Sequence, residues 1–256
     1  MRKIIIKHQI IIVVIMLSGC VSYYPQTVDI PLIKEKGDIR VDAGMFFIPD
    51  THPKENHVTT NAGDDATTIS IKRTLANAGA HATFSAGLTD VMAVQAYVSM
   101  DGQFRSHLQG ALGLFKSFGN NMVTELYGGY GYGTSGFESN FRLDENNTLF
   151  GNYHLAFAQL NLGKTDWGSK HIDYGLGVKG GHFFCNQEQF SEDPPIYQKN
   201  GWMVEPSVFF RFGNKKMKIC TKINYLWTNS VAKEVYYPLS LSFGVNMHFG
   251  KTANRE

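Results

Sequence analysis

Apolar and polar residues alternate with a period of two over most of the chain that follows Gly37. Towards the end, for example, positions 239, 241, 243, 245, 247 and 249 are apolar, and the positions between them are polar or glycine. Such alternation predicts β-strands that have one apolar and one polar face. Ten strands are predicted, near residues 37–48, 77–87, 91–100, 107–118, 122–133, 149–162, 170–184, 202–212, 216–227 and 238–249.

The length of these strands narrows the fold further. Most contain 10 to 13 residues, which is the length that crosses a bilayer core at a tilt near 45°. Strands of ordinary soluble proteins average about 5 or 6 residues. No convincing amphipathic helix pattern occurs after residue 20. The sequence therefore predicts an all-β protein, an up-and-down antiparallel β-barrel of about ten strands.

The connections between the predicted strands are of two kinds. Short ones, rich in Gly, Asn and Asp, follow the second, fourth, sixth and eighth strands, whereas longer polar ones follow the first, fifth, seventh and ninth. Only the connection near residues 101–103 is short where a long one is expected. Alternating connections on an even number of strands are typical of outer-membrane barrels, whose short turns face the periplasm. Both ends of the chain are then expected on the periplasmic side.

The polar faces of the strands carry charges of both signs and many glycines. In a membrane barrel these faces line a narrow lumen, where opposite charges pair and fill the space. A narrow ion path is the alternative. A soluble lipocalin-like barrel with its apolar faces turned inward is a rival fold, because alternation alone does not distinguish inside from outside. The residues predicted to form a lumen charge network are Arg40, Asp42, Glu125, Asp173, Lys179, Glu205, Arg211 and Lys222.

The amino terminus has the pattern of a bacterial lipoprotein signal. A basic start precedes an apolar run at residues 10–17, which is shorter than the roughly 20 residues of a membrane-spanning helix. Leu17, Ser18, Gly19 and Cys20 follow, and they resemble a lipobox, at which the signal is cleaved and the cysteine is acylated. A plain secretory signal and an uncleaved anchor are the alternatives.

A division of the chain follows from this motif. Residues 1–19 are predicted to be the signal peptide, 20–36 a lipidated tether, 37–250 the barrel and 251–256 a polar tail. Cys20 is expected to carry a diacylglycerol and an N-acyl group, such as palmitate. Val21 follows it. In bacterial families an Asp at that position favours retention in the inner membrane, so Val21 favours transfer to the outer membrane.

The stretch from Tyr23-Tyr24-Pro25 to Asp38 resembles the lead-in of uncharacterised lipidated barrels from Bacteroides- and Flavobacterium-type bacteria. That resemblance covers sixteen residues. It implies an outer-membrane lipoprotein whose partners are membrane lipid and the machineries for lipoprotein sorting and barrel assembly.

Sequence motifs for chemistry are weak. A formal charge of +2 without a basic patch gives no argument for nucleic acid. The nine histidines show no HExxH or paired His/Cys spacing, so neither a metal nor a catalytic residue is predicted and no cofactor is expected. Cys185 and Cys220 are expected to remain unbonded, and one disulfide between them in an oxidising envelope compartment is the alternative. A lipid A-modifying enzyme is a minor alternative. Its candidate residues are His182, Ser191 and Glu192 in or beside one long connection and Ser230 in another, but no motif orders them as nucleophile, base and orienter.

The function predicted from the sequence is therefore structural or surface-interacting. The barrel is expected to be anchored by lipid and to have a filled lumen, with its long connections as the contacting parts. A narrow porin or transporter for small solutes is one alternative. A lipocalin-like carrier of an apolar ligand in the periplasm is the other.

Overall fold

The computed structural model describes residues 28–48, 54–62, 65–73, 77–101, 106–134, 137–138, 148–167, 171–188, 200–228 and 239–250. Nearly all of them lie in strands. The elements are β1 (Ile39–Ile48), β2 (Lys54–Ala62), β3 (Asp65–Arg73), β4 (Asn77–Gly87), β5 (Met92–Asp101), β6 (Ser106–Phe118), the 3-10 turn η1 (Gly119–Asn121), β7 (Met122–Thr134), β8 (Phe137–Glu138), β9 (Thr148–Trp167), β10 (Ile172–Glu188), β11 (Asn200–Gly213), β12 (Met217–Tyr225), β13 (Trp227–Thr228) and β14 (Leu239–Phe249).

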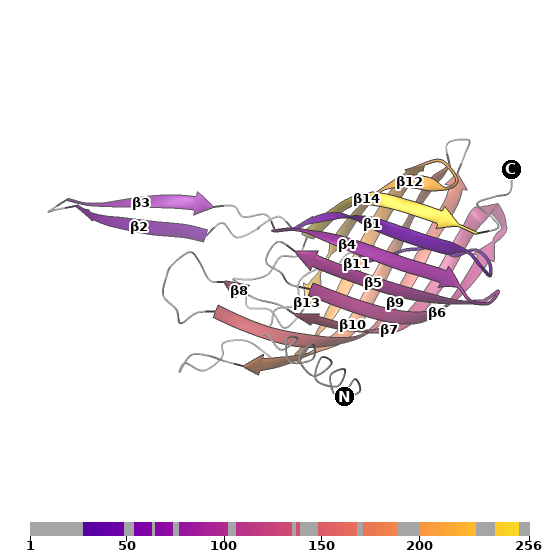
Figure 1. Ribbon diagram of the computed structural model, residues 1–256, viewed down its shortest axis with the longest axis horizontal. Helices are drawn as coiled ribbons and strands as arrows, with labels where there is room; N and C mark the ends of the chain where they lie inside the picture. The colour runs from indigo at the N-terminus through magenta and orange to yellow at the C-terminus, as the bar shows by residue number, and fades with distance from the viewer. Residues whose placement is uncertain are drawn as a thin grey trace, which may run out of the picture.

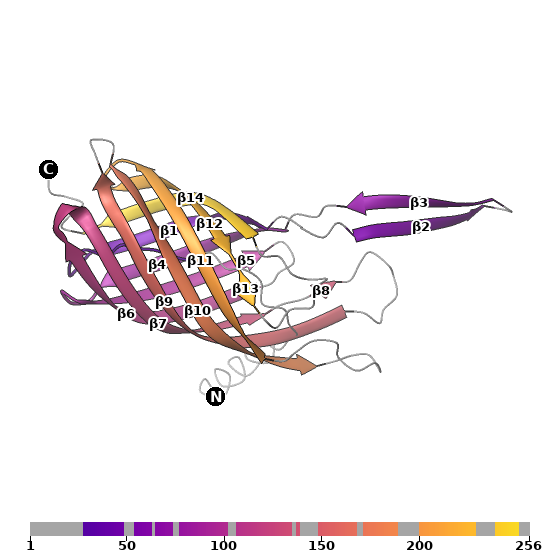
Figure 2. The same ribbon diagram turned by 180° about the vertical axis from the view of Figure 1, so that it is seen from behind.

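Ten long antiparallel strands close into a barrel (Figures 1 and 2). Their order around the wall is β1, β4, β5, β6, β7, β9, β10, β11, β12 and β14. The last of them pairs with the first, from Ile39↔Phe249 to Phe47↔Leu241. The predicted ten-stranded barrel is thus confirmed, and its strands start and end within a few residues of the predicted positions.

The two ends of the barrel differ in their connections. At one end, called the turn end below, β4 joins β5, β6 joins β7, β9 joins β10 and β11 joins β12, each through three or four residues. β1 begins and β14 finishes at the same end. The opposite end, called the loop end, carries the long connections. The alternation of connections predicted from the sequence is therefore present.

A hairpin within the first long connection was not predicted. β2 pairs with β3 from Lys54↔Arg73 to Ala62↔Asp65, and Figure 1 shows the pair lying beyond the loop end of the barrel. Among the described residues, β2 and β3 pair only with each other. The sequence indicated only a polar connection here because the alternation in these strands is weak.

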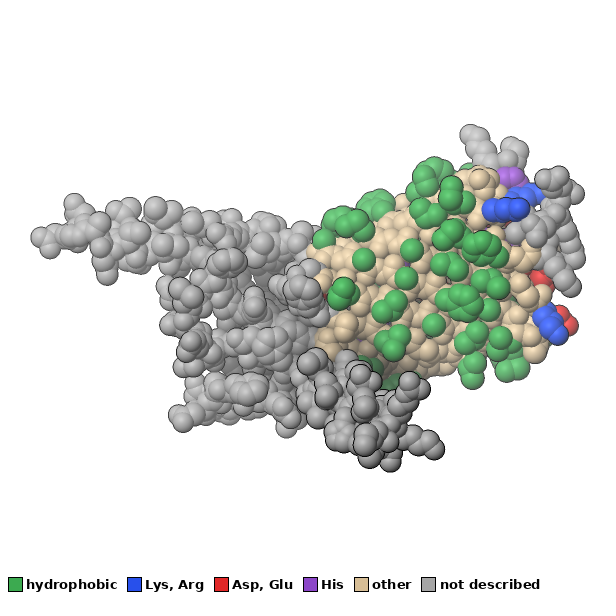
Figure 3. All heavy atoms as spheres, viewed as in Figure 1, with side chains coloured by type: hydrophobic (Ala, Val, Ile, Leu, Met, Phe, Trp, Pro, Cys, Tyr) green, Lys and Arg blue, Asp and Glu red, His purple; other side chains and the backbone are tan. Residues whose placement is uncertain are grey.

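The exterior of the barrel is apolar on every long strand. Figure 3 shows hydrophobic side chains spread over the wall, with charged ones gathered at the turn-end rim. Ten outward-facing side chains, one from each strand, are between 44% and 59% exposed: Met45, Phe84, Val98, Leu112, Leu126, Leu160, Leu176, Val208, Ile219 and Phe243. Soluble monomers rarely expose an apolar surface of this extent. The apolar faces therefore point outward, as in a membrane-spanning barrel, and not inward as in a lipocalin.

Aromatic side chains mark both edges of this apolar belt. Trp202 and Trp227 are exposed near the loop end, and the Trp227 ring packs edge-on against Tyr225 at 5.9 Å. Phe212 and Phe249 are exposed near the turn end. Aromatic residues at these levels are typical of the two membrane–water interfaces. Tyr236 and Tyr237, which precede β14 in the sequence, lie outside the described residues.

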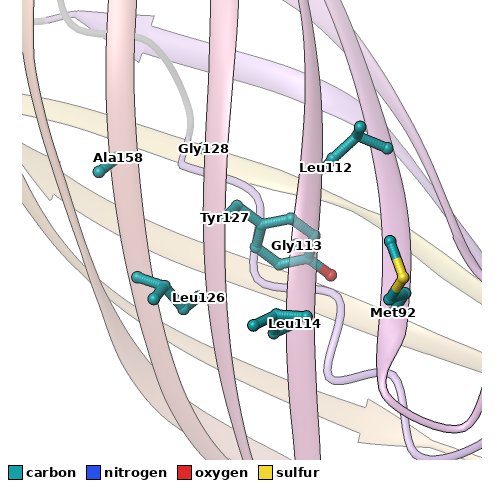
Figure 4. Close-up of a pocket in the computed structure, with 8 residues that line it drawn as sticks. All are labelled: Met92, Leu112, Gly113, Leu114, Leu126, Tyr127, Gly128 and Ala158. Atoms are coloured by element: carbon teal, nitrogen blue, oxygen red, sulfur yellow. The ribbon is translucent and has the colours of Figure 1, made fainter.

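One shallow groove interrupts the belt. Its volume is about 390 Å³, and it lies where Gly128 and Ala158 present little or no side chain between Leu112, Leu114 and Leu126 (Figure 4). Its lining offers no charged group, and it faces the bilayer region of the wall. It is therefore not a candidate for chemistry.

No helix among the described residues is long and apolar enough to span a membrane.

Candidate functional site in the barrel lumen

The lumen contains a segment of the chain that precedes β1. This lumen segment comprises residues 28–35, and its first six residues are buried. Val28, Ile30, Leu32 and Ile33 have no exposed surface, and Asp29 is 1% exposed. The sequence predicted an extended, lipidated tether over residues 20–36 that leads to the first strand. The structure places residues 28–35 of that range inside the wall of strands, so this part is not a free linker.

The lumen segment runs from the loop end to the turn end. The Val28 N–H donates to Asn224 Oδ1 at 3.2 Å, and Asn224 is the residue before the loop-end terminus of β12. At the other extreme, Lys34 Nζ donates to Asp166 at 2.9 Å, close to the turn end of β9. Gly37, with φ of +84°, then turns the chain into β1. The segment is therefore antiparallel to the strand that follows it.

Asp29 is the most heavily bonded residue of the lumen segment. Its backbone carbonyl accepts hydrogen bonds from Gln95 Nε2 at 3.1 Å and from Gln159 Nε2 at 2.5 Å. Its carboxylate accepts from Ser85 Oγ at 3.3 Å and lies 3.5 Å from Lys222 Nζ. Four wall strands thus hold one residue, and a buried carboxylate is tolerated because a cation and polar donors surround it.

Two further wall side chains bind the backbone of the segment. Arg211 Nη2 donates to the Ile30 carbonyl at 2.6 Å. The Ile33 N–H donates to Glu125 Oε1 at 2.7 Å, and Glu125 Oε2 accepts from Asn161 at 2.9 Å. Charge-assisted hydrogen bonds of this kind are stronger than neutral ones. Two of the charged residues that were predicted to fill the lumen therefore also hold the lumen segment in place.

Wall glycines make room for the apolar side chains of the segment. A Cβ on Gly163 would lie 2.8 Å from Leu32 Cδ1, and a Cβ on Gly177 would lie 2.8 Å from Ile30 Cδ1. Leu32 itself adopts a left-handed backbone with φ of +58°, which costs about 1–2 kcal/mol for a non-glycine residue. Such a conformation persists only where surrounding contacts fix it. The wall is thus shaped to this segment.

The eight side chains of the predicted lumen network are all buried. Asp42 is the centre of one cluster. Its carboxylate lies 3.2 Å from Lys222 Nζ, 3.2 Å from His81 Nε2 and 4.0 Å from Arg211 Nη2. Because Lys222 also faces Asp29, this cluster joins the wall to the lumen segment.

A second cluster lies near the turn end. Asp173 accepts a hydrogen bond from Lys218 Nζ at 2.6 Å and lies 3.7 Å from Arg40 Nη1. Lys218 also donates to Asp166 at 3.0 Å, and Asp166 is the residue that Lys34 of the segment contacts. The turn end of the lumen is therefore crossed by ion pairs from four wall strands, β1, β9, β10 and β12, and from the segment.

Lys179 and Glu205 form a separate pair. The two residues face each other across β10 and β11, with Lys179 Nζ 3.0 Å from Glu205 Oε2 and neither side chain exposed. Lys179 Nζ also lies 5.7 Å from the centre of the Phe157 ring. The structure thus brings the network residues together as several clusters around the lumen. Glu125, like Arg211, binds the backbone of the lumen segment.

The sequence missed an aromatic row in the loop half of the lumen. His81 stacks on Tyr97 at 6.2 Å, Tyr97 contacts His107 at 5.9 Å, and His107 stacks on Tyr153 at 5.5 Å. The Tyr153 hydroxyl and His107 Nδ1 are hydrogen-bonded at 2.7 Å. His107, the first residue of the strand predicted over residues 107–118, is the second residue of β6 and faces inward. Every second residue from His107 through Gln109 and Ala111 lies on the same face of the strand. This period was the feature of the sequence that indicated an inward-facing His107.

The remaining predicted positions have varied outcomes. Cys20 and the lipobox residues Leu17, Ser18 and Gly19 lie outside the described part of the chain, as do Ser191 and Glu192. Cys220 is a buried free thiol. His182 faces outward and packs against Phe184 at 4.6 Å. Over the described ranges, no three His, Cys, Asp or Glu side chains are grouped so as to hold a metal ion.

Comparison with known proteins adds little to this geometry. No protein-family model matches the chain, and no curated protein matches it. Among solved structures, it is similar to the crystal structure of the outer membrane protein OprG from Pseudomonas aeruginosa, with 11% sequence identity and a TM-score of 0.39. The match covers 87% of this chain and 100% of that one. Similarity at this level carries no functional information for this chain.

Proposed function

We propose that the protein is a lipid-anchored outer-membrane β-barrel that does not conduct and that acts at the cell surface through its long connections. An even number of strands, short turns at one end and an apolar belt with aromatic edges make it a barrel of the outer-membrane type. The observation that carries the proposal is the lumen segment, because residues 28–35 occupy the space that solute would need.

The size of the barrel supports a closed lumen. Barrels of about eight strands are filled by their own side chains, whereas porins of 16–18 strands leave an aqueous channel. Ten strands enclose somewhat more space than eight, and here that space holds a stretch of chain. Because Asp29, Ile30 and Ile33 are each hydrogen-bonded to the wall, the segment is fixed rather than loosely inserted.

Because the lumen is closed, the long connections are the parts of the protein that can interact with other molecules at the cell surface. The β2–β3 hairpin lies beyond the loop end of the barrel (Figure 1). If the turn end lies in the periplasm, as we propose, this hairpin stands outside the cell. Its two strands have open edges among the described residues, and open edges are surfaces to which another strand can add. This arrangement supports a surface-interaction role in preference to transport.

Purified full-length protein reconstituted into planar bilayers should give no stepwise conductance. Insertion has to be verified in the same preparation by protection from added protease and by a mobility difference between unheated and boiled samples on SDS gels. Reproducible single-channel steps from inserted wild-type protein would overturn the closed-lumen proposal and establish the narrow porin in its place.

Acylation is tested by metabolic labelling with palmitate. Wild-type protein should incorporate the label, and Cys20→Ala should abolish it because the acceptor thiol is lost. Cys185→Ser and Cys220→Ser are matched controls that remove the other two cysteines, and both should label as the wild type does. Label that persists in Cys20→Ala would refute the lipid anchor.

A further inference from the structure

We infer that the chain preceding Val28 leaves the barrel at the loop end, so that the amino terminus lies on the outer side of the membrane. The lipid on Cys20 would then sit in the outer leaflet. This inference rests on the proposed outer-membrane location, which assigns the loop end to the cell surface. It reverses the sequence-based expectation that both termini are periplasmic.

The order of contacts along the lumen segment gives its direction. Val28 contacts Asn224 near the loop end of β12. Asp29 contacts Gln95 and Gln159, which lie well within β5 and β9. Ile33 then contacts Glu125, the fourth residue of β7 from the turn end. Successive residues therefore lie progressively closer to the turn end, and the preceding chain points towards the loops.

A return path through the lumen is blocked. On the side of the segment facing β6, β7 and β9, Ile33 packs in an apolar cluster that includes Phe115, Tyr127 and Phe157. On the other side lie the buried ion pairs of Asp42 and Asp173. A second pass of the chain would have to displace one of these layers. The chain before Val28 can therefore continue only towards the loop end.

The reach of the intervening chain fixes the leaflet. Val28 lies eight residues after Cys20 in the sequence, and these eight residue steps span at most about 26–29 Å when fully extended. The hydrocarbon core is about 30 Å thick. From a start near the loop end, this length reaches the outer interface easily but cannot pass round the outside of the wall to the inner one. An acylated Cys20 is therefore confined to the outer leaflet.

Three versions of the full-length protein test this topology, each with the same epitope at one position. The first carries it after Val21, the second within residues 139–144 of a long connection, and the third after Glu256. Each version is first shown to keep the folded mobility of the wild type on unheated SDS gels. Intact cells are then probed with an antibody that cannot cross the outer membrane.

The tag after Val21 should be detected on intact cells as strongly as the tag in the long connection. The tag after Glu256 should appear only after the cells are permeabilised. If the connection tag is detected and the Val21 tag is not, the inferred direction of the chain is refuted while the proposed location survives. If neither the connection tag nor the Val21 tag is detected on intact cells, the proposed location fails, and this inference fails with it.

Discussion

Replacing residues 28–33 with an alternating Gly-Ser sequence is expected to turn the silent barrel into one that conducts ions. The replacement removes the apolar side chains that pack on Gly163 and Gly177, and it removes the Asp29 carboxylate. Without these groups, little apolar burial or hydrogen bonding favours the position of the segment inside the lumen over its exposure to water. Lys222, Arg211 and Glu125 would then face solvent in a polar passage.

Planar-bilayer recordings of the Gly-Ser variant measure this effect. Discrete steps should appear, and they should be much smaller than those of porins with 16–18 strands because the ten-stranded wall is narrow. The matched control places the same six-residue replacement at residues 139–144 of a long connection, and it should remain silent. A Gly-Ser variant that inserts, folds and stays silent would show that side chains of the wall close the lumen on their own.

The Lys179–Glu205 pair is expected to give the largest effect on stability. Glu205→Gln keeps the shape of the side chain but leaves a fully buried ammonium opposite a neutral amide. Removing one partner of a buried pair typically costs about 3–5 kcal/mol, because the remaining charge is uncompensated. Lys179→Met should reduce the free energy of unfolding by a similar amount, since it leaves the buried Glu205 carboxylate without its cation.

A double-mutant cycle separates the pair from its surroundings. Lys179→Met combined with Glu205→Gln removes both charges and should recover most of the loss, since neither ion then needs compensation. The control is Lys216→Met at an exposed turn position, which should change stability by less than about 0.5 kcal/mol. Urea titration of the folded band on unheated SDS gels gives the free energies. Additive losses in the double variant would mean that the two charges do not act as a pair.

The strands of the wall were predictable because their environment is uniform. Every second residue of a long strand faces lipid and is apolar. The alternation is therefore visible in the sequence of stretches such as Leu239 to Phe249. The buried position of Arg40, Asp173 and Arg211 followed from the same period, because a charge on the opposite face would have met the bilayer. What each charge binds did not follow, since the period says nothing about distances across the lumen.

The lumen segment was not predictable by the same reasoning. Its buried core is short and contains Pro31, which favours an extended tether over a strand. Its partners are scattered from Ser85 to Asn224, so no local pattern connects them. One property did set it apart, because Val28, Ile30, Leu32 and Ile33 are more apolar than an exposed tether needs. That excess is explained only by the interior of the barrel.

The pairing of β1 with β14 has a consequence for assembly order. The lumen segment is continuous with β1, and the wall closes only when β1 meets the last strand to be synthesised. If the amino-terminal end carries acyl chains, it is too bulky to be drawn through a finished ring of strands. The wall must then form around a segment already in place, with the β1–β14 seam closing last. On this route an empty, completed barrel never exists, so the membrane is not exposed to an open pore during biogenesis.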